Sequence, residues 1–293
     1  MVSYAQENKY QMDQELQKCI KAASAAAANL KLVPPVSSGS FDGSRTGSGT
    51  GGAMEFADYR AYRAGDELRR VDWRLYARSE QLMVRRFAQE TSPRCDIILD
   101  FSRSMEFYGK KAAMLGMGAF FAKSALNANF SLQVWGIGDA LMKMTAPGEP
   151  ELWEVPAQGG RKEPFPLFEE LRSGLFRNGV RILISDLFFN MAPGELMKNL
   201  GGGNVIILQV LGAEELFPSL SGAVTVTDPE SGANKVIHVD SAALERYREE
   251  LSNFQSRYVE VARSHNASIF FLNGADVVKN WNVENFCREG ILQ

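Results

Sequence analysis

The stretch "RCDIILDFSRSM", residues 94–105, contains both a buried strand and a candidate site. Its apolar run ends at Asp100, and two serines, Ser102 and Ser104, follow at alternate positions. A short, continuous apolar run predicts a strand that is buried on both faces of a sheet. The three polar residues admit two interpretations. Aspartate and serine often cap the first turn of a helix, and their oxygens are also ligands for a hard metal ion.

Similar apolar runs recur downstream and are separated by helical patterns. They are "FSLQVWGIG", "VRILISDLFF", "NVIILQVL" and "ASIFFLN". Apolar strands that alternate with helices predict a parallel sheet covered on both faces. We therefore expect an α/β fold: a doubly wound, mostly parallel sheet over residues 94–290, in which "AVTVTD" and "KVIHVD" form a hairpin.

A second aspartate follows another of these strands. Asp186 ends the run "RILISD", just as Asp100 ends the first one. The carboxyl ends of parallel strands lie at one rim of the sheet, which is where ligands bind in doubly wound folds. Two carboxylates and two serine hydroxyls form a set of hard oxygen ligands that suits Mg²⁺ or Mn²⁺. Asp186 therefore favours the metal interpretation of Asp100, Ser102 and Ser104 over the helix cap.

The chain upstream of this domain has two parts. Residues 5–31 are rich in alanine and predict a helix, which Pro34 and Pro35 would end. The stretch "SSGSFDGSRTGSGTGGAMEF" is rich in glycine and serine and is typical of a loop or linker. We therefore divide the chain into an N-terminal helix at residues 1–33, a loop with an arginine-rich segment at 34–93, and the α/β domain at 94–290.

The segment from residue 60 to residue 86 combines many arginines with aromatic and acidic residues. One interpretation is a nucleic-acid surface on which bases stack. The mixed charges favour instead a network of arginine–carboxylate pairs that fixes an irregular segment, and arginine with tryptophan also suits a protein interface. The candidate interaction residues are Arg60, Asp66, Arg69, Asp72, Trp73 and Arg78.

Composition limits the class of protein. The chain has 293 residues and a net charge of −3, which does not suggest a partner as acidic as nucleic acid. No apolar run approaches the length of a membrane span, and the start lacks the pattern of a signal peptide, so we expect a cytoplasmic protein without membrane insertion. The scattered cysteines, Cys19, Cys95 and Cys287, agree with a reducing compartment.

Sequence motifs for catalysis are few. His238 and His265 are the only histidines, which leaves little for a zinc site or a histidine-dependent triad. Neither a P-loop nor a G-x-S-x-G elbow is present. A phosphohydrolase of the haloacid-dehalogenase type usually has a second acid two residues after its nucleophilic aspartate, where this chain has Ser102. We therefore expect no enzyme, with an Asp100-dependent phosphohydrolase as a less favoured alternative.

A long motif precedes the first strand of the α/β domain. The sequence "GTGGAMEFADYRAYRAGDELRRVDWRLYARSEQLMVRRFAQE" resembles the signature of the domain-of-unknown-function-58 family, "EF-D-R-Y-x-x-GD-x-x-R-x-DW-x-x-AR". The matching residues are Glu55, Phe56, Asp58, Arg60, Tyr62, Gly65, Asp66, Arg69, Asp72, Trp73, Ala77 and Arg78. The resemblance continues through "LISDLFF" to "ALERYREEL" and covers roughly residues 35–275.

The resemblance implies a von Willebrand factor A-like domain with a metal-ion-dependent adhesion site. Such a site uses a D-x-S-x-S loop, a threonine from a second loop and an aspartate from a third. Asp100, Ser102 and Ser104 match the first loop, and Asp186 is similar in position to the third. The second loop should lie in "VPAQGGRKEPF", which contains no threonine. The resemblance therefore leaves open an ion bound weakly with more water, or no ion at all.

The resemblance also implies a partner, because proteins of this family look like partners of MoxR-type AAA+ ATPases. The implied role is an adaptor in a chaperone-like assembly that remodels or matures client proteins, whose identity the sequence does not give. An acidic residue of a partner would complete the coordination of an ion at Asp100. The alternative is a metal-independent adaptor that binds through the arginine-rich, aromatic segment.

Overall fold

A computed structural model describes residues 14–34, 54–89 and 92–293, apart from residues 158, 161–164, 202–203, 230 and 282. The chain forms two compact units. Unit 1 contains residues 1–35 and 93–293, and unit 2 contains residues 36–92. The first residues of the predicted N-terminal helix and most of the Gly/Ser stretch lie outside the described residues.

Unit 1 is built on a six-stranded sheet with the strand order β10-β7-β6-β3-β4-β5. The strands are β3 (Arg94–Asp100), β4 (Ser131–Ile137), β5 (Leu141–Lys143), β6 (Val180–Ser185), β7 (Asn204–Leu211) and β10 (Ala267–Asn273). Only the pairing of β4 with β5 is antiparallel within this sheet. The prediction of a doubly wound, mostly parallel sheet is therefore confirmed. The strand order reverses between β3 and β6, which is the position where such folds bind ligands.

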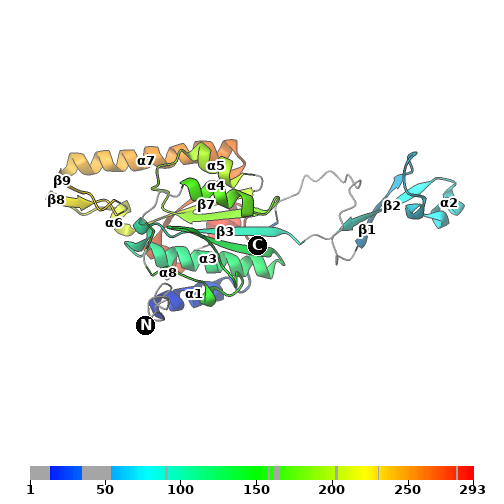
Figure 1. The fold of residues 1–293 in the computed structure, drawn as a ribbon, viewed down its shortest axis with the longest axis horizontal. Helices are drawn as coiled ribbons and strands as arrows, with labels where there is room; N and C mark the ends of the chain where they lie inside the picture. Colours follow the sequence, from blue (N-terminus) through cyan, green and yellow to red (C-terminus); the bar gives the residue numbers. More distant parts are fainter. Residues whose placement is uncertain are drawn as a thin grey trace, which may run out of the picture. The chain divides into compact units, whose positions relative to one another are not determined.

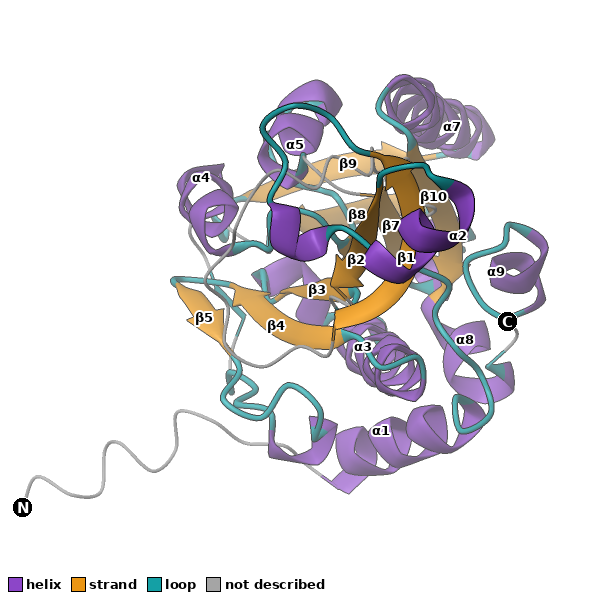
Figure 2. Cartoon of the chain, turned by 90° about the vertical axis from the view of Figure 1, so that its right-hand side faces the viewer, coloured by secondary structure: helices purple, strands orange, loops and turns teal. Residues whose placement is uncertain are grey.

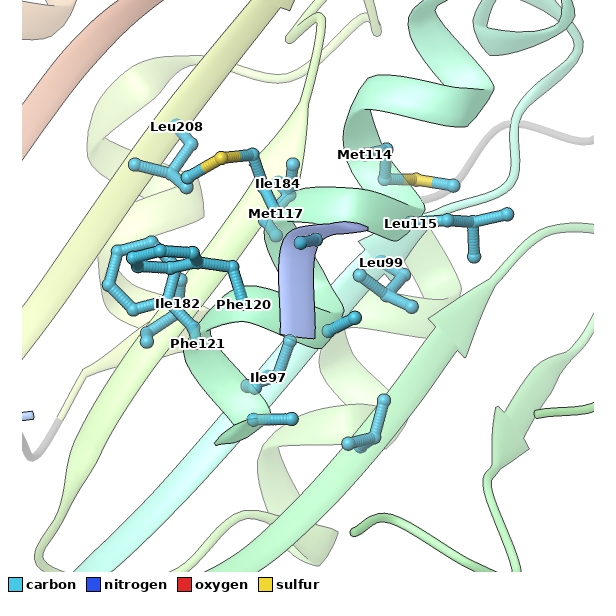
Figure 3. Close-up of a cluster of buried hydrophobic side chains, with 14 of the residues drawn as sticks. Ile97, Leu99, Met114, Leu115, Met117, Phe120, Phe121, Ile182, Ile184 and Leu208 are labelled. Atoms are coloured by element: carbon cyan, nitrogen blue, oxygen red, sulfur yellow. The ribbon is translucent and has the colours of Figure 1, made fainter. Parts of the chain in front are cut away.

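Helices cover both faces of this sheet (Figures 1 and 2). One face carries α1 (Gln14–Ala26), α3 (Lys110–Asn127) and α8 (Gly274–Asn280), and the other carries α4 (Phe165–Gly174), α5 (Pro193–Leu200) and α7 (Ser241–Ser264). Successive residues of β3 point to opposite faces, as the period of a strand requires. Ile97 and Leu99 pack beside α3 (Figure 3), whereas Ile98 belongs to the core on the other face.

The helix α1 packs against α3 and buries Ile20 and Ala23 completely. It ends at Ala26, so the predicted end at residue 31 is wrong. The side chain of Asn127 accounts for this early end, because its amide donates hydrogen bonds to the carbonyl oxygens of Ala27 and Leu30. The chain then becomes extended, and Leu32 pairs with Leu292 near the C-terminus.

A hairpin and further helices complete unit 1. The strands β8 (Gly222–Thr227) and β9 (Asn234–Val239) form the predicted hairpin. The helix α7 is capped by the side chain of Asp240. The helices α8 and α9 (Glu284–Arg288) are separate, because Trp281 takes a left-handed conformation after α8. No helix in the described ranges is both long enough and apolar enough to cross a membrane.

Unit 2 is a small antiparallel pair of strands with two short helical segments between them. Its elements are β1 (Met54–Ala61), the 3-10 helix η1 (Leu68–Arg70), α2 (Trp73–Ser79) and β2 (Met83–Gln89). The strand β2 lies within the stretch "QLMVRRFAQE" of the family motif. The register of the pair shifts between Phe56 and Asp58, where β1 has an irregularity.

Candidate functional site

The candidate site lies at the carboxyl rim of the sheet, the edge where the parallel strands of unit 1 end. Asp100 is the last residue of β3, and Asp186 directly follows β6, its neighbour in the sheet. Both side chains are buried, with relative exposures of 4% and 1%. The prediction that the two aspartates share one rim is therefore correct, and they lie at the point where the strand order reverses.

The loop after Asp100 brings side-chain oxygens of Asp100, Ser102 and Ser104 close together. Asp100 Oδ1 accepts a hydrogen bond from the backbone N–H of Ser102 at 2.8 Å. Its Oδ2 accepts one from the hydroxyl of Ser185 at 2.6 Å. The hydroxyls of Ser102 and Ser104 lie 3.1 Å apart. Ser102 precedes the 3-10 helix η2 (Arg103–Glu106), but its hydroxyl does not cap that helix, and α3 begins after Gly109. The arrangement agrees better with a ligand loop than with a helix cap.

Burial gives the carboxyl group of Asp100 an unusual pKa. Desolvation and the negative charge of Asp186 raise the pKa of Asp100 to about 6, although hydrogen bonds from Ser185 and Ser102 act in the opposite direction. A nearby positive charge favours the ionised form of such a group. A cation bound close to Asp100 would therefore favour its ionised form.

A buried lysine, which the sequence did not indicate, binds the second aspartate. The ammonium group of Lys110 donates to Asp186 Oδ2 at 2.8 Å and to Glu215 Oε1 at 2.6 Å. Its side chain is only 1% exposed, and its nitrogen lies 5.8 Å from the centre of the Phe188 ring. Burial lowers the pKa of Lys110, but the charges of the two carboxylates outweigh that effect and the net shift is upward. Lys110 is therefore a fixed internal cation.

The second predicted loop lies against the first one. Ser102 forms a parallel bridge with Gly160, and the backbone N–H of Arg103 donates to the carbonyl of Gly160 at 2.8 Å. A Cβ atom on Gly160 would come within 2.5 Å of the backbone nitrogen of Asp139, so this close packing suits glycine. The loop thus reaches the expected place, but it presents glycine backbone there instead of a threonine. Its residues 158 and 161–164 lie outside the described residues.

The donor set is compatible with a hard divalent cation at Asp100. Asp100, Ser102 and Ser104 supply oxygen ligands, and a carboxylate oxygen can accept more than one bond. Asp186 is already paired with Lys110. Within the described part of the chain, no three acidic, cysteine or histidine side chains are grouped to share an ion. Hydroxyl groups, water or an outside carboxylate would therefore complete the coordination.

Exposed aromatic side chains lie on segments that leave the same carboxyl rim. They are Phe107, Tyr108, Phe188 and Phe217, with exposures of 44%, 52%, 42% and 71%. These residues come from the loops that follow β3, β6 and β7, together with the end of the short helix α6 (Ala213–Leu216). Tyr108 lies directly against Gly212, where a Cβ atom would clash with it. Several exposed aromatic side chains on one rim are typical of a protein-binding surface.

In unit 2, the predicted interaction residues divide into two groups. The first group holds the segment together. The guanidinium of Arg60 binds both carboxylate oxygens of Asp66, at 2.7 and 2.6 Å, and agrees with the predicted arginine–carboxylate network. Asp72 caps α2 by accepting from the N–H groups of Arg74 and Leu75, and it also accepts from the Tyr59 hydroxyl at 2.8 Å.

The second group faces solvent. Trp73 is 55% exposed and packs edge-on against Tyr76, with ring centres 6.2 Å apart. Arg69 and Arg78 are also exposed. A tryptophan held in place on a helix beside arginines has the composition of a binding hot spot. Unit 2 therefore carries a separate candidate surface, which we call the Trp73 surface: Arg69, Trp73, Tyr76 and Arg78.

The chain is similar to a protein family and to curated relatives. Residues 58–257 match the family described as "Protein of unknown function DUF58". The chain is 25% identical over 231 residues to the uncharacterized proteins Rv1480 of Mycobacterium tuberculosis and Mb1516 of Mycobacterium bovis. The match covers 70% of this chain and 69% of each relative.

Solved structures give more distant similarities. One is the conserved hypothetical protein BatB from Bacteroides thetaiotaomicron, with 13% identity and a TM-score of 0.35 over 68% of this chain and 99% of that chain. Another is an aerotolerance-related membrane protein from Bacteroides fragilis, with 14% identity and a TM-score of 0.36 over 66% of this chain and 100% of that chain.

Proposed function

Because the chain belongs to the DUF58 family, which it matches over residues 58–257, we propose that it is a non-enzymatic adaptor. In this proposal it binds proteins at its carboxyl rim with the help of a divalent cation. The observation that carries the proposal is the combination at this rim. A centre of hard oxygen atoms, Asp100, Ser102 and Ser104, lies on the same rim as exposed aromatic side chains. The centre suits a cation, and the surrounding surface suits a protein.

The ion in this proposal is Mg²⁺ or Mn²⁺, held by Asp100, Ser102 and Ser104 with Asp186 close by. When bound, it would supply positive charge and open coordination positions at the rim. A carboxylate of the partner protein would take one of these positions. The aromatic side chains would then bury apolar surface around that contact, which is the usual source of affinity at the centre of an interface.

The partner we propose is a MoxR-type AAA+ ATPase, with which the chain would remodel or mature client proteins. Support for this partner comes from the family resemblance of the sequence. The proposed contacts also predict the chemistry of the partner surface. The ATPase, or a client, should present an acidic side chain to the ion and apolar side chains to the aromatic residues.

A binding assay tests this proposal directly. A purified MoxR-type ATPase from the same genome is titrated onto the immobilised chain in Mn²⁺ and in a chelator. We expect binding in Mn²⁺ that is lost in the chelator and in Asp100→Ala. Phe217→Ala should weaken it at least about tenfold, because Phe217 is the most exposed of the four rim aromatics, at 71%. Asp240→Asn is the control, because asparagine caps α7 as well as aspartate does. Equal binding in the chelator and in Asp100→Ala would contradict the proposal.

A second candidate is favoured by the exposure of Trp73 on α2. In this alternative the adaptor binds without metal, through the Trp73 surface. The same assay separates the two candidates. Binding that survives both the chelator and Asp100→Ala, but is lost in Trp73→Ala with an unchanged circular dichroism spectrum, would support the second candidate. Loss of binding on chelation would count against it.

A further inference from the structure

Lys110 occupies a position that local helix rules do not favour. It is the first residue of α3, where the helix dipole is positive, and the first turn of α3 contains no acidic residue. A lysine at this end of a helix is unfavourable by a few tenths of a kcal/mol to about 1 kcal/mol. A lysine that is 1% exposed also needs ionic partners to remain charged. Tertiary contacts therefore explain its position.

Those contacts join three loops of the carboxyl rim. Lys110 lies at the start of α3, after the loop that follows β3, and its ammonium reaches Asp186 after β6 and Glu215 on α6. The other carboxylate oxygen of Glu215 accepts from the backbone N–H of Gly212 at 2.8 Å, which fixes its orientation. The nitrogen of Lys110 thus has two carboxylate partners at 2.8 and 2.6 Å. Such contacts leave it little freedom to move.

The charges at the rim are unequally compensated. Two carboxylates, Asp186 and Glu215, lie against one ammonium group. Asp100 ends the strand next to that of Asp186, and the charge of Asp186 contributes to its raised pKa, but Asp100 makes no ion pair within the described part of the chain. Without Lys110, Asp186 would keep an uncompensated negative charge at this rim and would attract a divalent cation more strongly.

We propose that Lys110 is the resident counter-cation of this rim and sets its affinity for divalent cations. By holding Asp186 and Glu215, it leaves Asp100 as the acidic ligand that the described residues of the rim offer to an ion, together with the hydroxyls of Ser102 and Ser104. The free chain therefore binds an ion weakly, and firm binding requires a carboxylate from outside. This inference rests on the proposed cation site and adds what limits it: a tethered ammonium reduces the number of acidic ligands.

Calorimetric titration of Mn²⁺ into full-length variants tests the inference. Lys110→Met removes the ammonium with little change in length. Lys111→Met is the matched control, because Lys111 follows in the same helix turn but binds Glu106 and the carbonyl of Pro156 instead. We expect Lys110→Met to bind Mn²⁺ at least about tenfold more tightly than wild type. The variant lacks the positive ammonium that repels the positive ion. Lys111→Met should bind as wild type does. The gain should disappear in the double variant Lys110→Met/Asp100→Ala.

The outcomes distinguish this inference from the proposed function. Tighter binding in Lys110→Met with none in wild type would support the role of Lys110 and contradict a metal-assisted function of the native chain. Equal affinity in wild type and Lys110→Met would overturn the inference and leave the metal site standing. Absence of binding in both would overturn both. A purely structural salt bridge predicts lower stability without any change in Mn²⁺ affinity.

A separate measurement covers the case in which Lys110→Met does not fold. If the variant is unfolded without metal, circular dichroism follows its refolding as Mn²⁺ is added. The inference predicts that Mn²⁺ restores the fold, since the ion replaces the missing ammonium among the carboxylates. Failure to refold at any Mn²⁺ concentration up to the millimolar range would overturn the inference.

Discussion

Unit 1 and unit 2 each contain a basic side chain that binds a carboxylate, and the two distances are almost the same. Lys110 lies 2.8 Å from Asp186, and Arg60 lies 2.6 Å from Asp66. The pairs differ in burial: both side chains of the first are 1% exposed, whereas those of the second are 39% and 18% exposed. Removing one partner of a buried pair leaves an uncompensated charge, while water screens an exposed pair. Burial, not distance, should therefore decide the effect of each mutation.

The largest expected effect is on the buried pair. Lys110→Met should lower the free energy of unfolding in metal-free buffer by about 3–5 kcal/mol, because Asp186 and Glu215 lose their counter-charge. Urea denaturation followed by circular dichroism measures this change. Lys111→Met, whose side chain is partly exposed, should cost less than about 1 kcal/mol. Equal losses in the two variants would show that burial does not separate them.

A second effect is a dependence of stability on pH. The folded pKa of Asp100, about 6, lies above its ordinary value of 3.8. The native state therefore holds a proton that the unfolded state has released, and stability falls as pH rises from about 4 to about 6. The decrease should reach about 2–3 kcal/mol. Asp100→Asn should remove this part of the pH dependence in metal-free buffer. An unchanged slope in that variant would contradict the raised pKa.

A smaller effect is expected at the cap of α2 in unit 2. Asp72 is 5% exposed, and its side chain accepts from the N–H groups of Arg74 and Leu75. Asp72→Ala should destabilise α2 locally by about 1 kcal/mol. Hydrogen exchange at the amides of Arg74 and Leu75 measures the loss, and Asp72→Asn should retain most of the protection. Unchanged exchange in Asp72→Ala would show that the cap is dispensable.

The smallest effect is expected at the exposed pair. The hydrogen bond from Arg60 lowers the pKa of Asp66 to about 2, with smaller contributions from Arg63 and from Coulomb attraction. The stability that this carboxylate contributes is present above about pH 4 and is lost as pH falls toward 2. At neutral pH, Arg60→Ala should change the unfolding transition too little to measure, and salt should reduce the effect further. A loss of unfolding free energy as large as that of Lys110→Met would show that exposure does not weaken the pair of Arg60 and Asp66.

Much of the fold could be predicted from periodicity. The apolar runs identified the core strands, and the aspartates at the ends of two of these runs correctly indicated that Asp100 and Asp186 share one rim. Helix ends were less predictable. The early end of α1 depends on Asn127, a residue about a hundred positions away, and the break between α8 and α9 depends on the left-handed conformation of Trp281.

The main omission was the internal cation. Lys110 lies in "GKKAAM" and Glu215 in "GAEELF", and no spacing joins two residues that are more than a hundred positions apart. A weak signal was present, because a lysine in the first turn of an apolar helix opposes the helix dipole. Residues that break a local rule often have a tertiary role. The sequence correctly placed the two candidate aspartate ligands at one rim but could not show that Asp186 is paired with Lys110.

Calorimetric titration of Mn²⁺ into the wild type and Asp100→Ala tests the central claim, that the carboxyl rim holds a divalent cation at Asp100. We predict a weak, saturable binding event in the wild type that is absent from Asp100→Ala and unchanged in the Asp240→Asn control. The same heat of binding in the wild type and Asp100→Ala would contradict the claim.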